Sequence, residues 1–587
     1  WRSKTPIIFR AMDQWFININ HVLQRRDYAP PLPKGEGRGE GEGTVIQPAT
    51  SDAGPTFRQS ALQEIDRVKW IPDWGINRIK GAVESRPDWC ISRQRTWGVP
   101  IPAFYDANSE PILDARIVRN VAALVEKQGS NVWFATSAAD LWKQVKPADW
   151  TGPEAVAKSA DTLDVWIDSG SSSRAVTAQR PELRGADKAF QADVYLEGSD
   201  QHRGWFQSSL LISLAGNGAA PFKTVLTHGF MVDADREKIS KSKQAQAGYE
   251  KPQTAEAYVK KWGADIVRLW VASQDYRNDI VVSEERISKV AETYRGIRNT
   301  LRYQLSNLYD FDPAKHSVPD DQLTGLDRWI LGEFAKLEAD VLKAYDAYEF
   351  HVVYQRMSQF SAVELSAMYH DFIKDRMYTN AANSSRRRSS QTALHRMVKG
   401  LCQMLSPILA YTADEAWEFV PGVSGSVHEG EWKSRGVEIS STQQETWQRL
   451  FELRGAVLLE LEKVRQGKTI GKALEAETEL KVPREALNPD THVAADWVAI
   501  VTVGESQIGF RRDFWSESNL VDLKEILSIS RIDKTAGDKP YLEIVVRRAS
   551  GQKCERCWHW ETDVGTHAEH PTLCGRCVQA VEESPVA

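Results

Sequence analysis

The sequence predicts a multidomain protein with an α/β part, an all-α part and a small C-terminal metal-binding segment. Three observations predict this architecture. Short apolar strands alternate with helical segments between about residues 60 and 280. From about residue 283, apolar residues recur at helical spacing, which is typical of a helical bundle. Four of the six cysteines fall in one short span near the C-terminus.

Composition narrows the possible classes of protein. The chain has 587 residues, enough for about four domains. Hydrophobic residues make up 42% and charged residues 26%, which excludes a wholly disordered chain. The balance of 74 Lys and Arg against 80 Asp and Glu gives a net charge of −6, so any nucleic-acid surface has to be a local patch. The sequence contains no apolar run of 18 residues, so no membrane span or membrane partner is expected.

The segment that follows the first 28 residues differs in composition from the rest. Residues 29–43 are rich in proline and then alternate glycine with charged residues, and Leu32 is their one sizeable apolar side chain. Such a segment buries too little apolar surface to offset the entropy of ordering. We expect a disordered insert at about 29–57.

A β-α-β unit is predicted in the first half of the chain. Asp193–Leu196 and Thr224–His228 are typical of strands, and Gly204–Leu214 between them is typical of a helix. Ligands of parallel sheets bind beyond the carboxyl ends of the strands. The polar residues at Glu197–His202 and from His228 onward are therefore the expected site.

The helical part carries three amphipathic patterns, and a strand-like run follows them. The helices are predicted around Trp329–Tyr345, Leu394–Leu405 and Trp447–Val464, and the strand at Leu542–Val546.

The cysteine-rich span has the spacing C-x2-C, sixteen residues, C-x2-C. The four residues are Cys554, Cys557, Cys574 and Cys577. Two such pairs, brought together, complete a tetrahedral site, so one structural zinc ion per chain is predicted. The alternatives are two redox pairs or two disulfides. A histidine in the loop is a further candidate ligand: His559, His567 or His570.

Two segments carry residues suited to a nucleotide. Lys238–Ser242 places two lysines three residues apart with hydroxyls of Ser240 and Ser242, a pattern that neutralises a leaving pyrophosphate, although a solvated basic turn has the same composition. Upstream, Gly198 allows a ligand close to the backbone. Acceptors for ribose hydroxyls or an ammonium group come from Glu197, Asp200 and Gln201, and Trp205 offers an apolar wall.

These segments resemble class I aminoacyl-tRNA synthetases of the isoleucine, valine and leucine branch. Lys238–Ser242 resembles the family's KMSKS signature with Ile239 in place of Met, and Gly198–Gln201 matches its G-x-D-Q motif. Arg93–Pro100 and the four-cysteine tail resemble the isoleucine enzymes of bacterial type. Asp371–Arg376 and Tyr411–Trp417 look like the anticodon-binding domain.

The resemblance implies a domain order. It comprises the second half of a Rossmann-type catalytic domain, a helical-bundle anticodon-binding domain and a small C-terminal zinc-binding domain. The expected bounds are 1–85 for the end of the editing insertion, 86–282 for the catalytic half, 283–440 for the anticodon-binding domain, 441–548 for a junction region and 549–587 for the zinc domain.

The resemblance also implies an activity and its residues. Such an enzyme activates isoleucine with ATP and Mg²⁺ and transfers it to isoleucine tRNA, as a cytoplasmic monomer. Lys241 would be the main ATP lysine, with Lys238 in support. The adenylate would contact Glu197, Gly198, Asp200, Gln201 and His228. Trp166 and Trp205 would wall the isoleucine pocket, with plain core packing as the alternative.

The family's other ATP signature, His-Ile-Gly-His, does not occur in this sequence. Trp1–Phe16 resembles the end of the editing insertion, so the chain is expected to hold the distal part of a synthetase and not to aminoacylate alone. A valine or leucine enzyme is disfavoured by Arg93–Pro100 and the cysteine tail. A tRNA-binding protein that has lost catalysis remains the alternative from another class.

A basic run is the candidate tRNA contact in the helical part. Arg386, Arg387 and Arg388 lie between serine pairs, before a helix expected from about Gln391. They predict a phosphate contact, with a solvated loop as the alternative. The cysteine tail adds cations beside Trp558 and Trp560, a combination that suits RNA loops.

Overall fold

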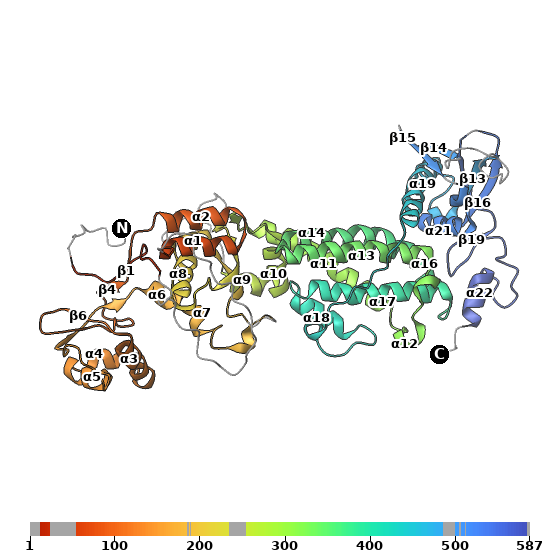
Figure 1. The fold of residues 1–587 in the computed structure, drawn as a ribbon. Helices are drawn as coiled ribbons and strands as arrows, with labels where there is room; N and C mark the ends of the chain where they lie inside the picture. The colour runs from red at the N-terminus through yellow and green to blue at the C-terminus, as the bar shows by residue number, and fades with distance from the viewer. Residues whose placement is uncertain are drawn as a thin grey trace, which may run out of the picture. The chain divides into compact units, whose positions relative to one another are not determined.

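The computed structural model describes residues 12–23, 54–184, 187, 189–233, 254–484, 499–503, 506–510, 512–539 and 541–583. The chain divides into two compact units (Figure 1). The first comprises residues 1–231 and 276–280, and the second comprises residues 232–275 and 281–587. Most of the Gly- and Glu-rich insert lies outside the described residues.

A three-stranded parallel sheet forms the centre of the first unit. Its order is β2 (Lys69–Ile71), β10 (Phe222–His228), β9 (Ala192–Gly198). The helix α8 (Trp205–Asn217) links β9 to β10, which confirms the predicted β-α-β unit. The apolar side chains of α8 pack with the strands in one core, and Gly218 ends the helix at φ 77°, where a residue without Cβ is unstrained.

Further short elements surround this sheet. They are β1 (Phe16–Ile17), α1 (Phe57–Arg67), α2 (Trp74–Glu84), β3 (Trp89–Cys90), β4 (Ser92–Arg93), β8 (Thr162–Leu163), α6 (Val165–Gly170) and α7 (Ser172–Ala175). β1 pairs with β3 and β4 pairs with β8, both antiparallel. The helix α1 begins at Phe57 behind Thr56, whose side chain accepts a hydrogen bond from the Gln59 N–H in a capping box.

A second apolar core lies within the first unit. It is built from β5 (Phe104–Tyr105), β6 (Pro111–Ile112), α3 (Ala115–Gln128), α4 (Asn131–Ala135), α5 (Ala138–Val145) and β7 (Ala157–Lys158). The ring of Phe104 lies edge-on to both Trp133 and Trp142, with centroids 5.1 and 5.2 Å away. Aromatic packing of this kind accounts for part of the high tryptophan content.

The second unit is mainly a bundle of helices, several of them long (Figure 1). They are α9 (Ala255–Trp262), α10 (Ala264–Ser273), α11 (Glu284–Ser306), α13 (Gly325–Asp346), α14 (Phe350–Phe360), α16 (Lys374–Thr379), α17 (Ser385–Leu405), α18 (Ala410–Glu418) and α19 (Ser441–Gln466). Trp329, Ile330, Phe334, Leu337 and Val341 are all buried, so the predicted apolar face of α13 is confirmed.

A polar cluster is enclosed where α13, α16 and α17 meet. Asp327 of α13 is fully buried and accepts a hydrogen bond from the Tyr369 hydroxyl at 2.7 Å. The Arg376 guanidinium donates to it at 3.1 Å, and the hydroxyls of Ser389 and Ser390 donate at 2.5 and 2.9 Å. Because these donors satisfy both carboxylate oxygens, the charge is tolerated inside the bundle.

The C-terminal part of the second unit returns to a mixed sheet. Its central strand β13 (Ala476–Pro483) pairs in parallel with β16 (Arg531–Gly537) and antiparallel with β17 (Glu543–Arg548). The strand β17 confirms the predicted strand at Leu542–Val546 with slightly shifted bounds. A hairpin of β14 (Ala499–Val503) and β15 (Ser506–Phe510) and the helix α21 (Glu517–Leu527) complete this region.

Asp522 on α21 makes the stability of this region depend on pH. It is 5% exposed, and burial raises its pKa to about 7. A raised pKa means that the folded state favours the protonated form, so stability is full below pH 4 and declines as pH rises to about 7. Asp522→Asn is therefore expected to match the parent at pH 4 and to exceed it by about 2–4 kcal/mol at pH 8. Unfolding midpoints across this pH range would measure the difference.

The control for this prediction is Asp538→Asn, because that side chain is 85% exposed in a surface ion pair with Arg484. It should change stability by less than about 1 kcal/mol at any pH. Equal effects of Asp522→Asn at pH 4 and pH 8 would contradict the proposed titration.

Candidate functional site: the end of the sheet and a cysteine cluster

The carboxyl ends of β9 and β10 place the predicted nucleotide residues together. In the parallel register Glu197 is opposite Thr227, and Gly198 is opposite His228. The short helix η2 (Ser199–Arg203) follows β9 directly. A Cβ on Gly198 would lie 3.0 Å from the Asp200 carboxylate and 3.7 Å from the His228 ring. The sequence-predicted acceptors therefore surround one backbone position at the edge where ligands of parallel sheets bind.

Gln201 connects this edge to the helix that follows. Its side-chain oxygen accepts a hydrogen bond from the Trp205 N–H at 2.9 Å, and its amide nitrogen donates to Asp200 at 3.3 Å. The side chain thus serves as the cap that Gly204, which precedes α8, does not provide. Asp200 and Glu197 are exposed at the open end.

Trp166 and Trp205 lie on either side of Gly204. The Trp205 ring stacks on Tyr195 with centroids 4.2 Å apart, and its indole N–H donates to the Ser169 carbonyl at 2.9 Å. Trp166 is 39% exposed, and a Cβ on Gly204 would lie 2.9 Å from its ring. One face of Trp205 is therefore used in packing, and the pocket role of the two tryptophans stays a prediction. Lys238–Ser242 lies outside the described residues.

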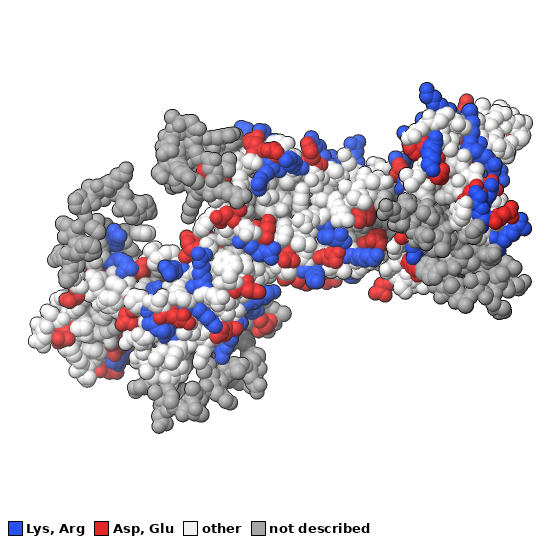
Figure 2. Space-filling model, turned by 90° about the horizontal axis from the view of Figure 1, so that it is seen from above, with Lys and Arg blue, Asp and Glu red and all other residues white. Residues whose placement is uncertain are grey.

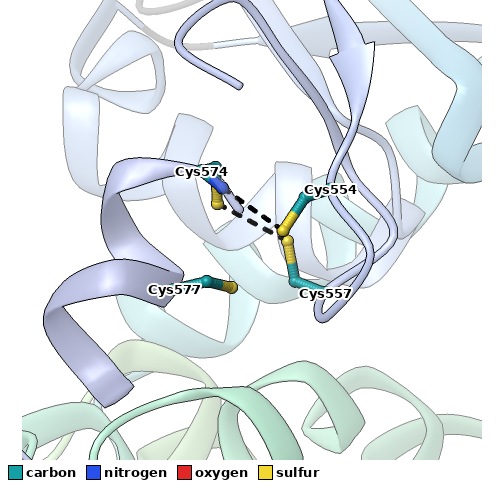
Figure 3. A group of neighbouring side chains, drawn as sticks. All are labelled: Cys554, Cys557, Cys574 and Cys577. Atoms are coloured by element: carbon teal, nitrogen blue, oxygen red, sulfur yellow. Dashed lines mark hydrogen bonds between the residues drawn. The ribbon is translucent and has the colours of Figure 1, made fainter. Parts of the chain in front are cut away.

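The four C-terminal cysteines form one buried cluster (Figure 3). Two come from the turn after β18 (Gln552–Lys553), and two from the start of α22 (Gly575–Glu582). All four sulfur atoms lie within 4.8 Å of one another, and the sulfurs of Cys557 and Cys574 are 3.8 Å apart. Four Zn–S bonds of about 2.3 Å in a tetrahedron place sulfurs about 3.8 Å apart, so the site fits zinc.

The chemistry of the cluster also suits a metal. The four thiols are buried side by side and offer four sulfur ligands, which zinc binds as thiolates. All the cysteines are free, which excludes the two disulfides. Among the described residues no histidine joins the group: His559 lies beside Asp375, and His567 beside Asp563.

The cysteine cluster is attached to the helical bundle through α16. Arg576 pairs with both carboxylate oxygens of Asp375, one of them at 2.9 Å, and Arg556 donates to the Thr379 carbonyl. Burial is the largest influence on Asp375 and opposes its ionisation, but the hydrogen bond and charge of Arg576, together with His559 and Thr379, outweigh it and lower the pKa of the carboxyl. The carboxylate therefore stays charged and paired at neutral pH.

The structure corrects the expectation for two of the three consecutive arginines. The run lies in the first turn of α17, which begins at Ser385 and not near Gln391. Arg387 is 2% exposed and pairs with Asp310 at 2.6 Å, and Arg388, 8% exposed, donates to the Asp310 carbonyl at 3.0 Å. Neither a solvated loop nor a phosphate contact fits these two. Arg386 is partly exposed and pairs with Glu525 at 2.5 Å.

Arg386 lines a cavity of about 820 Å³ between α16, α21 and the cysteine cluster. Cationic and aromatic side chains share its wall, among them Lys524, Arg556, Tyr378 and Trp558. Trp558 is 54% exposed and lies beside Lys553, whose ammonium is 5.4 Å from the ring. On the face of the molecule in Figure 2, positive and negative side chains are interspersed over the described residues. The cavity wall is mixed in the same way, with five basic and five acidic side chains.

Comparison with known proteins identifies the class. Residues 3–283 match the model of class I tRNA synthetases (I, L, M and V), and residues 327–480 match the anticodon-binding domain of tRNA ligase. Residues 551–580 match a zinc finger found in FPG and IleRS. The chain therefore belongs to the class I tRNA synthetases, which confirms the predicted fold class and the zinc site.

Curated relatives indicate the branch of the class I tRNA synthetases to which the chain is similar. The isoleucine–tRNA ligases of Geobacter sulfurreducens and Moorella thermoacetica are each 41% identical over 99% of this chain. Within its class the chain belongs to the isoleucine–tRNA ligase family, as the Arg93–Pro100 segment predicts. It spans 57% of the length of these relatives. A solved LeuRS of Agrobacterium radiobacter K84 aligns with 59% of this chain and 42% of its own, at 19% identity and a TM-score of 0.43.

Proposed function

We propose that the chain is the distal part of an isoleucine–tRNA ligase, which joins isoleucine to its tRNA through an isoleucyl-adenylate. The opposition of Gly198 and His228 at the ends of β9 and β10 carries the proposal. It gathers acceptors for ribose and ammonium groups where a nucleotide binds a parallel sheet. The names of the curated relatives indicate that the amino acid is isoleucine. We place the enzyme in the cytoplasm as a monomer, with ATP and Mg²⁺ as substrate.

Two groups of residues in the first unit bind the adenylate and the amino-acid side chain. Glu197, Gly198, Asp200, Gln201 and His228 contact the adenylate, because their backbone and side chains converge on one open edge. Trp166 and Trp205 wall the side chain of the amino acid.

The loop from Lys238 to Ser242 holds the pyrophosphate that leaves during the reaction. Lys241 is the main cation and Lys238 supports it, and the hydroxyls of Ser240 and Ser242 add donors. These groups act where negative charge grows during the reaction.

The tRNA contacts the second unit near Arg386 and Trp558. Both line the cavity between α16, α21 and the zinc site, whose wall combines charged side chains of both signs with aromatic rings. Exposed aromatic rings beside cations stack on the bases of RNA loops.

Among the described residues, no helix has both the length and the apolarity needed to cross a bilayer.

The proposal is tested by isoleucine-dependent exchange of pyrophosphate into ATP. The 587-residue chain alone is expected to show no exchange, because the sequence lacks the His-Ile-Gly-His signature. Mixing it with the remaining N-terminal portion of the Geobacter sulfurreducens relative is expected to restore exchange. In the mixture, Lys241→Ala should lower kcat by about 10²–10³-fold, the effect of losing one transition-state donor.

Substrate choice and a matched control complete the test. Valine should react about 10–200-fold less efficiently than isoleucine, because it lacks one methylene group. Lys260→Ala, on an exposed position of α9, should leave the rate unchanged. Exchange by the chain alone would overturn the dependence on the N-terminal portion, and a mixture that prefers valine or leucine would overturn the assignment to isoleucine.

A further inference from the structure

A cavity of about 300 Å³ in the first unit lies between β3, α6 and the first turn of α8. The walls include Arg86, Trp89, Trp166, Arg203 and Gln207. Trp166, proposed to wall the amino-acid side chain, is shared with the candidate active site, whereas Glu197, Gly198, Asp200, Gln201 and His228 do not line the cavity. The donors in its wall are unusual, because two of them are buried without an acceptor.

Gln207 is the first of these donors. Its side chain is 2% exposed. The side-chain oxygen accepts a hydrogen bond from the Arg86 guanidinium, and a guanidinium can only donate, so the orientation of the amide is fixed. The amide nitrogen then has no hydrogen-bond partner among the described residues. A buried donor without an acceptor costs about 1–3 kcal/mol, which an acceptor bound in the cavity would recover.

Arg86 provides the second buried donor without an acceptor. Its Nε–H is buried and likewise lacks a partner in the described part of the chain. The guanidinium lies over the Trp89 ring at 4.9 Å, which leaves its edge for an acceptor. Burial lowers the pKa of Arg86, although the nearby charge of Asp164 acts in the opposite direction. The charge of Arg86 is thus only partly compensated by the protein.

The remaining charges around the cavity leave an excess of positive potential. Asp164 accepts hydrogen bonds from Arg93 at 2.7 Å and from the Trp89 indole at 3.2 Å, and Asp88 accepts one from the Ile19 N–H at 3.0 Å. Both carboxylates are therefore engaged.

Arg203 adds a cation to those of Arg86 and Arg93, and it is exposed at the cavity mouth. It directly precedes Gly204 and the first turn of α8, the positive end of a helix of 13 residues. The N–H of Trp205 is already bonded to Gln201, so the side chains of Gln207 and Arg86 are the main open donors.

We propose that this cavity binds an oxyanion, a phosphate or a carboxylate, held by Gln207 Nε2 and the Arg86 guanidinium with Arg203 at the mouth. The donors of this site are separate from the residues proposed to contact the adenylate, although Trp166 is common to both, and the proposal does not depend on the activity of the chain. A planar guanidinium and an amide are donors of the kind that bind the two oxygens of one group.

The test uses the full chain and two probes, inorganic phosphate and acetate, added at constant ionic strength. Binding is followed by isothermal titration calorimetry and by the thermal midpoint. Saturable binding of phosphate, of acetate or of both is expected, and the stronger probe identifies the source of the oxyanion. Gln207→Glu keeps the acceptor for Arg86 but replaces the open donor with an acceptor of negative charge. It should lower the affinity more than 10-fold while the thermal midpoint without ligand stays equal or rises.

Arg86→Met should lower the affinity to a similar extent. The control Arg119→Met removes an exposed arginine of α3 and should leave binding unchanged. Binding that is equal in the parent and in Gln207→Glu would overturn the site, as would the absence of saturable binding of either probe. If Arg119→Met and Arg86→Met weaken binding equally, the attraction is a general effect of charge and the proposal is wrong.

Discussion

Cys554→Ser is expected to abolish zinc binding and to unfold the segment from about residue 552 to residue 583. The core of this segment consists of the four cysteines with Val564 and Leu573, so almost no apolar contact remains once the metal is lost. Structural zinc supplies about 10–16 kcal/mol in comparable small domains. Elemental analysis should find one zinc ion per parent chain and none in the variant, and proteolysis should cut the variant within this segment.

Cys90→Ser is the matched control, since Cys90 is half-buried in the first unit and lies outside the cluster. It should retain one zinc ion per chain. Stoichiometric zinc in Cys554→Ser would show that another group, such as His559, completes the site, and the assignment of four sulfur ligands would fail.

Asp327→Ala is expected to destabilise the helical bundle by about 3–5 kcal/mol. The substitution removes one of the two carboxylates that pair with Arg376, which is 1% exposed and keeps Glu525 as its partner. It also leaves the buried hydroxyls of Tyr369, Ser389 and Ser390 without their acceptor, and several unsatisfied polar groups are among the most costly changes in a protein core. Native-state hydrogen exchange of the amides in α13 and α17 measures this loss locally, without assuming that the two units unfold together.

A double variant separates the ion pair from general damage to the core. Asp327→Ala with Arg376→Met removes both charges and should recover part of the loss, while Glu525 keeps its contact with Arg386. If the double variant is less stable than the sum of the two single variants, the pair does not couple as the buried geometry implies.

The elements that the sequence predicted well are those whose apolar residues are spaced according to the element's own geometry. The strands β9 and β10 and the helices α8, α13 and α17 all carry apolar residues at the period of their own structure, so burial and element type follow together. The cysteine spacing is equally local, and the cluster forms as expected. The residues on β9 and η2 were found because they follow a strand end directly.

The remaining features depend on partners far away in the chain. Arg387 and Arg388 look like a surface patch because their partner Asp310 lies 77 positions earlier. Arg86 and Gln207 were missed for the same reason, since 121 positions separate them. One signal was present: Gln207 is a polar residue inside the apolar run of α8, and an amide there requires a partner that the run itself does not supply.

The short helix α16 has a consequence for how the chain is made. Its Arg376 pairs with Glu525, which is 149 positions later, and its Asp375 pairs with Arg576, which is 201 positions later. At about 5–20 residues per second, the ribosome needs about 10–40 s to synthesise the stretch from Asp375 to Arg576. During that interval a nascent bundle carries these charges without their final partners. Residues made well after the bundle helices therefore complete its ion pairs, and a chain cut short before Arg576 would leave Asp375 without this partner.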